Sequence, residues 1–310
     1  MAGAYDVVVI GGGAAGYTAA MFAARDRFRT LVLERFASGG QVLNCEHIEN
    51  YPGFPDGVAG YTLGPALQQQ ANNAGAELQM SEVTAVRREG DGVLVETDGE
   101  PVAARALIVA SGSRFTALGI PGEAEFLGKG ISHCASCDGS FFTSQPVAVV
   151  GGGDAAVDEA AHLTQYASQV TVIHRRDALR AAAALQERAR ANSKIRFRWN
   201  AAVRAIEGAE GVQRVMVEDL ATGTHEPLAV SGVFIYAGLT PNTEFLAGLV
   251  PLSAAGQIVT DIEMRTGVPG ILAAGDVRAQ SARLLAASAG DGATAAMAAV
   301  RYLRTGVWPR

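Results

Sequence analysis

The chain has 310 residues, of which 49% are hydrophobic and 37 are glycine, and its formal net charge is −6. Its length favours two domains, and its hydrophobic content excludes a disordered chain. The acidic balance argues against a nucleic-acid partner, and the glycines follow no collagen-like period. An uncharged run over residues 7–24 is interrupted by four glycines and has no Lys or Arg before it. We therefore expect neither a membrane span nor a signal peptide, but a cytoplasmic protein.

The first predicted elements are an apolar strand over residues 7–10, a glycine-rich turn over 11–16, a helix, and a second strand over 30–33. This βαβ pattern is typical of dinucleotide-binding units, in which the glycines permit a tight turn, close approach of the pyrophosphate and helix–strand contact. The start of the helix offers free N–H groups to the phosphates. Glu34 follows Gly16 by 18 residues. An acid near this spacing accepts hydrogen bonds from ribose hydroxyls, so this unit is predicted to bind FAD or NAD.

Between residues 76 and 109, short β-type runs alternate with turns, and these residues are predicted to form strands. A Cys-x-x-Cys pair, Cys134 and Cys137, follows. Such a pair is either half of a metal site or a redox-active dithiol. Three further residues could complete a metal site: Cys45, His47 and His133. The sequence contains no second Cys-x-x-Cys, so we expect no metal and favour a redox pair.

Two residues beside the pair bear on its chemistry. Asp138 is placed to protonate a leaving thiolate, although an Asp before Gly139 is also a common turn former. His133, if protonated, would lower the pKa of the Cys134 thiol, because a nearby positive charge favours the thiolate. The alternative is a neutral histidine that packs at a loop.

A second strand–turn–helix–strand pattern follows the first. It consists of a strand over residues 147–150, a Gly-Gly-Gly-Asp-Ala-Ala turn over 151–156 and a strand over 170–173. Two copies of the unit predict two nucleotides. In place of the acid of the first copy stand a histidine and three arginines: His174, Arg175, Arg176 and Arg180. Guanidinium groups bind a 2′-phosphate well, which predicts NADP. The alternative is a solvated helix start, on which Arg176 and Arg180 would share a face.

The rest of the chain supplies further strands and one long helix. Residues 212–217 and 233–235 are predicted strands, and residues 270–276 form an apolar strand that ends in a Gly-Asp pair. Residues 282–303 are small and apolar enough to form a buried helix.

Together these motifs resemble those of the low-molecular-weight, bacterial-type thioredoxin reductases. The matching segments run in family order over essentially the whole chain: Gly11 to Gly16, Gly39-Gly40-Gln41, Glu49-Asn50-Tyr51-Pro52-Gly53, Cys134 to Gly139, Gly151 to Ala156, His174 to Arg180 and Ala273 to Val277. The resemblance implies an α/β fold with two Rossmann-like, three-layer ββα dinucleotide-binding domains, and a homodimer with one FAD per subunit.

The resemblance also implies how the chain is divided. An FAD-binding domain takes residues 1–117 and 245–310. An NADPH-binding domain that carries the cysteine pair, residues 118–244, is inserted into it. We expect the chain to cross between the two near residues 115–121 and 239–245.

The site residues of the family map onto this sequence motif by motif. Cys137 would face the flavin, Cys134 would attack the external disulfide, and Asp138 would be the acid–base group. The residues expected to bind FAD are Gly11, Gly13, Ala14, Ala15, Gly16, Glu34, Arg35, Gly40, Gln41, Asn50, Val83, Ala110, Gly112, Gly275, Asp276, Arg283, Leu284 and Leu285. Those expected to bind NADPH are Gly151, Gly153, Asp154, Ala155, His174, Arg175, Arg176 and Arg180.

The implied reaction passes electrons from NADPH to the flavin, to the cysteine pair and then to a protein disulfide, with thioredoxin as the expected partner. The sequence departs from the family where Arg283-Leu284-Leu285 replaces Arg-Gln-Ala near the isoalloxazine, and where Cys45 and His47 replace polar residues near the flavin. These departures keep open an enzyme that acts on a small-molecule or specialised disulfide, or that uses oxygen as acceptor. A flavin-binding sensor without turnover is a third alternative, against which the intact cysteine pair argues.

Overall fold

The computed structural model describes residues 5–308, which divide into two compact units. The discontinuous unit comprises residues 5–114 and 240–308, and the inserted unit comprises Phe115–Leu239. Each unit has its own main sheet and its own hydrophobic core. Among the described helices, none is both long enough and apolar enough to span a membrane.

The seven-stranded sheet of the discontinuous unit combines parallel strands with an antiparallel hairpin. Its strands are β1 (Tyr5–Ile10), β2 (Thr30–Glu34), β3 (Glu77–Met80), β4 (Val83–Glu89), β5 (Gly92–Thr97), β6 (Val102–Val109) and β17 (Ile271–Ala273). They pair in the order β3-β2-β1-β6-β5-β4, and β17 also pairs with β6. Strand β6 pairs with β5 through residues 102–104 and with β17 through residues 107–109. The β4–β5 hairpin therefore pairs with only the first part of β6. Its apolar side chains cover the face of the sheet to which Val8 and Ile10 of β1 point.

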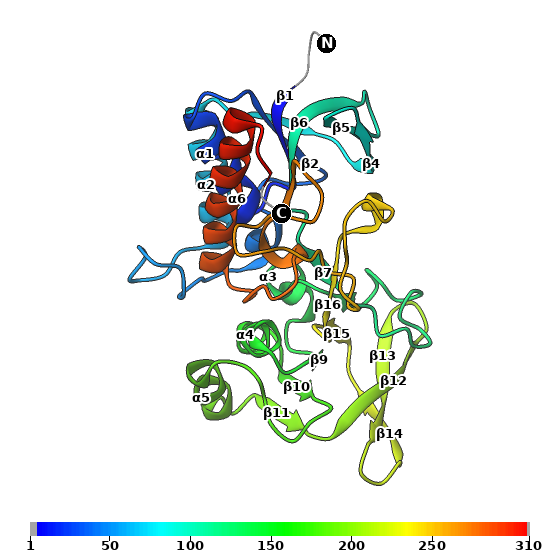
Figure 1. The fold of residues 1–310 in the computed structure, drawn as a ribbon. Helices are drawn as coiled ribbons and strands as arrows, with labels where there is room; N and C mark the ends of the chain where they lie inside the picture. The colour runs from blue at the N-terminus through cyan, green and yellow to red at the C-terminus, as the bar shows by residue number, and fades with distance from the viewer. Residues whose placement is uncertain (1–4, 309–310) are drawn as a thin grey trace. The chain divides into compact units, whose positions relative to one another are not determined.

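Three helices lie side by side over the other face of this sheet (Figure 1). They are α1 (Ala14–Arg25), α2 (Gly60–Ala74) and α6 (Leu285–Thr305), and the unit also has three short 3₁₀ helices, η1 (Gly40–Asn44), η3 (Glu244–Leu246) and η4 (Gly275–Val277). In β1, Val7 and Val9 face the helices, whereas Val8 and Ile10 face the hairpin. Because both faces are covered, this strand is apolar throughout instead of alternating with polar residues.

The inserted unit repeats this three-layer plan. Its main sheet is parallel, in the order β11-β10-β9-β15-β8, from strands β8 (Ile131–Ser132), β9 (Pro146–Val150), β10 (Gln169–Ile173), β11 (Ile195–Arg198) and β15 (Gly232–Ile235). One face carries the helices α3 (Ala135–Asp138), η2 (Gly139–Phe142), α4 (Asp154–Leu163) and α5 (Ala183–Ala191). The other face carries an antiparallel sheet of β12 (Ala201–Gly208), β13 (Val212–Asp219) and β14 (His225–Ala229). In β9, Val147 and Val149 face the helices and Ala148 and Val150 face the antiparallel sheet.

The predicted strands are present with small differences at their ends, except that the strand expected over residues 270–276 covers only Ile271–Ala273 and its Gly-Asp pair lies in η4. The long C-terminal helix is shifted. It was expected over residues 282–303 and instead runs from Leu285 to Thr305. Arg283 has a φ of 55°, a left-handed conformation that cannot belong to an α-helix, so the helix starts after it. Gly306 has a φ of 69° and ends the helix as a left-handed cap.

The two chain crossings between the units are short paired strands, β7 (Ser113–Phe115) and β16 (Leu239–Pro241). Beside them, on the discontinuous unit, the Ser111 hydroxyl donates to the Asn242 carbonyl at 2.7 Å, and the Asn242 amide donates to the Ser111 carbonyl at 2.8 Å. The Arg114 guanidinium donates to the Asn242 side-chain oxygen at 2.9 Å and pairs with Glu244. The two ends of the discontinuous unit are thus joined directly to each other.

Candidate active site

The glycine turn after β1 brings α1 against the strand and leaves the start of the helix open. Gly11 has a φ of 102°, a conformation that favours glycine. A Cβ at Gly16 would overlap the Gly11 carbonyl oxygen, so the close approach of helix and strand requires glycine there. A Cβ at Gly13 would meet nothing within 4 Å. The N-terminus of α1 therefore faces open space, as a pyrophosphate site requires.

Three further segments converge on this turn. Glu34, at the end of β2, accepts a hydrogen bond at 2.7 Å from the backbone N–H of the second glycine of the turn. Gly40 lies beside Gly13, since a Cβ at Gly40 would be 3.3 Å from the Gly13 Cα. Gly275 lies against Ala15 at the start of α1. Residues from four parts of the chain that were predicted to bind FAD are therefore close together.

Two polar side chains of this group are held by the protein itself. The Asp276 carboxylate accepts hydrogen bonds from the hydroxyls of Ser281 at 3.0 Å and Ser288 at 3.5 Å, and burial raises the pKa of this carboxyl. The Gln41 amide donates to the Ser113 carbonyl at 3.3 Å. Both side chains are thus oriented without a ligand.

The other predicted FAD residues surround this centre less closely. The Ala110 carbonyl lies against Gly11, and Arg35 forms an ion pair of 3.1 Å with Glu82, the neighbour of Val83. Gly112 accepts a backbone hydrogen bond from Asn242, and Leu285 begins α6. Among the described residues, no hydrogen bond joins three exposed loop residues to the turn: Asn50, Arg283 and Leu284.

The glycine turn after β9 has the same construction. A Cβ at Gly151, whose φ is 152°, would crowd the Tyr236 carbonyl at 2.7 Å, and a Cβ at Gly152 would overlap the His174 ring. A Cβ at Gly153 would again meet nothing within 4 Å. Asp154 and Ala155, the first residues of α4, are exposed, so this helix start is also open to a ligand.

The basic segment after β10 does not begin a helix, so the alternative of a helix start, on which Arg176 and Arg180 would share a face, is wrong. Residues 174–182 form a loop, and α5 begins at Ala183. Two tertiary hydrogen bonds hold this loop over the glycine turn. Arg180 N donates to the Gly152 carbonyl at 2.7 Å, and Ala182 N donates to the Asp154 carboxylate at 2.8 Å.

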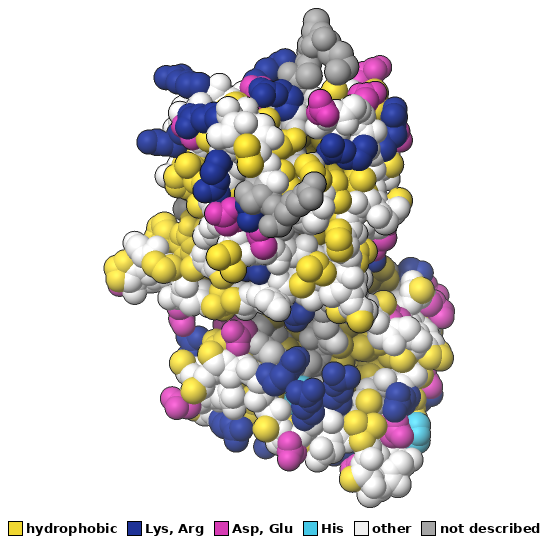
Figure 2. All heavy atoms as spheres, in the orientation of Figure 1, with side chains coloured by type: hydrophobic (Ala, Val, Ile, Leu, Met, Phe, Trp, Pro, Cys, Tyr) yellow, Lys and Arg dark blue, Asp and Glu magenta, His cyan; other side chains and the backbone are white. Residues whose placement is uncertain are grey.

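The loop nevertheless places its basic side chains beside the second glycine turn. Arg175, Arg176 and Arg180 are exposed, and Lys and Arg side chains gather on the inserted unit in Figure 2. His174 is only 5% exposed, and burial and the three arginines lower its pKa. Its Nε2 is buried without a hydrogen-bond partner. The result is a cationic rim next to an open helix start, which suits a nucleotide with a 2′-phosphate.

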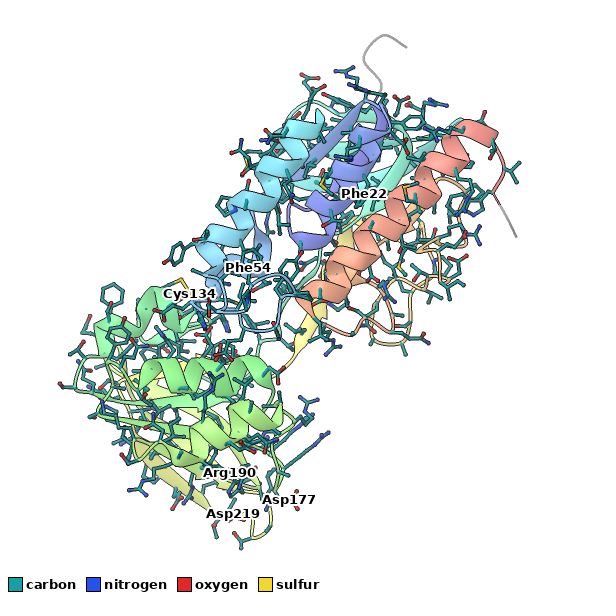
Figure 3. The ribbon with its side chains drawn as sticks, turned by 90° about the vertical axis from the view of Figure 1, so that its left-hand side faces the viewer. Phe22, Phe54, Cys134, Asp177, Arg190 and Asp219 are labelled. Carbon is teal, nitrogen blue, oxygen red and sulfur yellow. A yellow bond between two sulfur atoms is a disulfide. The ribbon has the colours of Figure 1, made fainter. Side chains whose placement is uncertain are left out.

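The cysteine pair forms a disulfide at the short helix α3 (Figure 3). Cys134 precedes α3 and is half-buried, whereas Cys137 lies in α3 and is exposed. The backbone N–H of Cys137 donates to the Cys134 sulfur at 3.2 Å. The Ser132 hydroxyl accepts from Cys134 N at 3.0 Å. The backbone around both sulfurs is thus fixed by hydrogen bonds.

Sequence reasoning missed one residue of this site, Glu159 on α4. Its carboxylate accepts a hydrogen bond at 2.8 Å from the backbone N–H of Ala135, which lies between the two cysteines. Burial and the neighbouring Glu159 carboxylate raise the pKa of Tyr236, and the Asp138 carboxylate acts on it in the same direction. Asp138, Glu159 and Tyr236 therefore surround the redox turn. A glutamate in an alanine-rich helix carries no sequence signal for such a role.

His133, the residue before Cys134, makes two packing contacts. Its Nδ1 lies 2.8 Å from the Ile235 carbonyl oxygen, so this nitrogen carries the hydrogen. Its ring stacks on Phe115 with the centroids 5.5 Å apart. These contacts show that the His133 ring packs at the loop.

His133→Ala is therefore expected to leave the pH profile of Cys134 alkylation unchanged and to lower the free energy of unfolding by about 1 kcal/mol, the scale of one hydrogen bond or one ring contact. Alkylation of the reduced protein and urea denaturation measure the two effects. A higher alkylation midpoint in the variant would contradict this expectation and restore the charged histidine.

No cluster of three or more His, Cys, Asp or Glu side chains in residues 5–308 is arranged to hold a metal ion. The two open glycine turns fit nucleotides instead. In such units the ribose is bound after the second strand. At that place the first glycine turn has the Glu34 carboxylate and the second glycine turn has arginines. The residues present therefore suit FAD in the discontinuous unit and NADPH in the inserted unit.

Comparison with known proteins agrees with this arrangement. Residues 5–299 match the family model described as pyridine nucleotide-disulphide oxidoreductase. The chain is 44% identical over 304 residues to thioredoxin reductase of Treponema pallidum, an alignment that covers 97% of this chain and 98% of the relative. The crystal structure of Lactococcus lactis thioredoxin reductase has a TM-score of 0.95 at 42% identity, with 97% of this chain and 99% of that chain covered. For the crystal structure of T. acidophilum thioredoxin reductase the TM-score is 0.92 at 34% identity, with 96% of this chain and 98% of that chain covered.

These likenesses confirm the predicted resemblance and the predicted α/β fold with two dinucleotide-binding domains. They also confirm the cofactors FAD and NADPH and the enzyme class, an NADPH-dependent flavoprotein dithiol–disulfide oxidoreductase. The chain belongs to the pyridine nucleotide-disulphide oxidoreductase family, and within it to the group of the low-molecular-weight thioredoxin reductases.

Proposed function

We propose that this enzyme reduces the disulfide of thioredoxin with electrons from NADPH, and that the discontinuous unit binds FAD while the inserted unit binds NADPH. The observation that carries the proposal is the Cys134–Cys137 disulfide, which lies in the same unit as an open glycine turn with an arginine rim. The relatives named thioredoxin reductase support thioredoxin as the substrate.

FAD, when bound, accepts a hydride from NADPH and supplies an electron pair to the disulfide. We assign its site to the glycine turn after β1, where Glu34 would accept hydrogen bonds from the ribose hydroxyls and where Gln41 and Asp276 are oriented by their own hydrogen bonds. The second glycine turn and its three arginines hold NADPH. The glycines let the phosphates approach the backbone, and the arginines bind the 2′-phosphate.

The cysteine pair exchanges two electrons and two protons. Reduction breaks the S–S bond, and Asp138, which adjoins Cys137, passes a proton to the departing thiolate. Cys134 then attacks the substrate disulfide as a thiolate and forms a mixed disulfide, which releases the first substrate thiol. Attack of Cys137 on the Cys134 sulfur restores the internal disulfide and releases the second substrate thiol. The division of roles between the cysteines follows the family motif.

A second candidate function uses a different electron acceptor in place of thioredoxin, either a small-molecule or specialised disulfide or oxygen. Leu284 favours it, since an apolar side chain that is 46% exposed stands where the family has a polar one near the flavin. Steady-state NADPH oxidation with thioredoxin, small disulfides and oxygen in parallel decides between them. We expect thioredoxin to give a kcat/KM at least about tenfold above every small disulfide, the size of one good additional contact. If the enzyme prefers a small disulfide or oxygen, that acceptor and not thioredoxin is its substrate. If it turns over with no acceptor, a flavin-binding sensor is favoured.

We also propose a homodimer and a cytoplasmic location. The family resemblance supports the dimer, and a cysteine pair that must cycle through the dithiol state suits a compartment that keeps thiols reduced. Sedimentation of the FAD-loaded protein as a single monomeric species would contradict the dimer.

A further inference from the structure

The carboxylate of Glu159 reaches the redox turn from a different helix. Its Oε2 accepts the backbone N–H of Ala135 at 2.8 Å, and Ala135 is fully buried in the core cluster that includes Ala156 and Ala160 of α4. Glu159 is thus bonded to the peptide that directly follows Cys134. Helix α4 is also the helix whose first residues form the second glycine turn. One helix therefore holds both the proposed NADPH site and the backbone between the cysteines.

The position of this carboxylate has two physical consequences. A buried backbone N–H that loses its only acceptor costs about 1–3 kcal/mol, so Glu159 contributes to holding the turn in place. A negative charge also disfavours another negative charge nearby, and a Cys134 thiolate would form one residue away from the bonded N–H. The hydrogen bond and the charge can be separated, because glutamine keeps an oxygen acceptor and removes the charge.

The titratable groups around the turn are few. His133 and Asp138 belong to the turn itself, and Glu159 reaches it from α4. Tyr236 follows β15 and is 8% exposed, and the ring of Tyr166 lies against Gly139. His133 donates to the Ile235 carbonyl, and burial raises the pKa of Tyr236. Asp138 therefore lies within the turn, whereas the Glu159 carboxylate bonds to the backbone of the turn from α4.

We propose that Glu159 is a positioning residue for the redox pair, which holds the peptide between the cysteines by its hydrogen bond and disfavours the Cys134 thiolate by its charge. This inference rests on the proposed role of Cys134 as the attacking thiol. It follows that the thiolate forms at a higher pH than it would beside an uncharged residue. A thiolate of higher pKa is intrinsically the stronger nucleophile once it has formed.

Two variants separate the contributions, and a third is the control. FAD-loaded Glu159→Gln and Glu159→Ala proteins are compared with wild type and with Glu187→Gln, which removes an exposed carboxylate from α5 of the same unit. Each protein is reduced with dithiothreitol, desalted and alkylated with iodoacetamide over a range of pH. Peptide mass spectrometry follows the rate at Cys134 separately from Cys137 and Cys45. Flavin content and circular dichroism verify that each variant is folded.

Both Glu159 variants are expected to lower the pH midpoint of Cys134 alkylation by about one unit, because the like charge is gone, and Glu187→Gln is expected to leave it unchanged. Reduction of thioredoxin disulfide should be about tenfold slower in Glu159→Ala than in Glu159→Gln, because only the alanine leaves the Ala135 N–H without its acceptor.

An unchanged alkylation midpoint in Glu159→Gln would overturn the role of the charge, and equal turnover of the two Glu159 variants would overturn the role of the hydrogen bond. The alkylation profile needs no substrate, so it tests this inference even if wild type fails to reduce thioredoxin. Such a failure would refute the proposed substrate alone.

Discussion

Cys134→Ser is expected to abolish disulfide reduction, with turnover at least about a thousandfold below wild type, the scale of removing a member of a catalytic unit. The remaining Cys137 becomes a thiolate which, if it faces the flavin, adds a long-wavelength band to the flavin absorbance. Cys137→Ser is expected to lose turnover to the same extent but to show no such band. Steady-state reduction of thioredoxin and visible spectra of the FAD-loaded variants measure both effects.

The structure makes the two cysteine variants informative because the two residues differ in exposure. Cys134 is half-buried and bonded to its surroundings, whereas Cys137 is exposed. Exposure alone would favour Cys137 as the thiol that meets the substrate, while the family motif assigns that role to Cys134. A band in Cys137→Ser instead of Cys134→Ser would reverse the two roles. Full activity in either variant would end the dithiol mechanism, and Cys45→Ser controls for the third thiol.

The double variant Arg175→Ala with Arg176→Ala is expected to weaken NADPH use by about one to three orders of magnitude. A hydrogen bond to a charged group contributes about 1.5–3 kcal/mol, and each 1.4 kcal/mol is about tenfold. NADH lacks the 2′-phosphate, so its use should change little, and flavin content should stay the same. The ratio of kcat/KM for NADPH and NADH measures the preference.

The loop that carries these arginines is held by backbone contacts that the substitutions leave intact. Arg180 N and Ala182 N are bonded to the second glycine turn and to Asp154, so the double variant removes side chains without releasing the loop. Arg214→Ala is a suitable control, because Arg214 is an exposed guanidinium on β13 that pairs with Glu207 at 2.6 Å. A wild type that prefers NADH, or a double variant that keeps the NADPH preference, would leave the basic cluster without a role in nucleotide choice.

The elements that sequence predicts well are those whose signal is local. The apolar strands and glycine turns at Gly11 and Gly151 are found as expected, because a turn with positive φ and a close helix–strand contact demand glycine at fixed spacing. The conformation of the segment from His174 to Arg180 was ambiguous because it depends on hydrogen bonds to Gly152 and Asp154, two residues of the second glycine turn that are distant in sequence.

Glu159 lay beyond sequence reasoning for the same physical cause. Its partner is a backbone N–H at Ala135, and any residue other than proline offers such a group, so no side-chain pattern marks the contact. The start of α6 was misplaced because a left-handed arginine at residue 283 is a tertiary outcome, not a propensity of the residue. The sequence therefore predicted the segments themselves, whereas the contacts between segments could not be predicted from it.

The reciprocal bonds between Ser111 and Asn242 have a consequence for how such a chain could arise. The points at which the chain leaves and re-enters the discontinuous unit are neighbours, tied by Ser111, Asn242 and Arg114. To the host fold, the whole inserted unit is therefore one surface loop, and the entropy of closing a loop grows only slowly with its length. A second nucleotide-binding module inserted at this point therefore leaves the contacts of the host fold intact, because Ser111, Arg114 and Asn242 already hold the two ends of the insertion together.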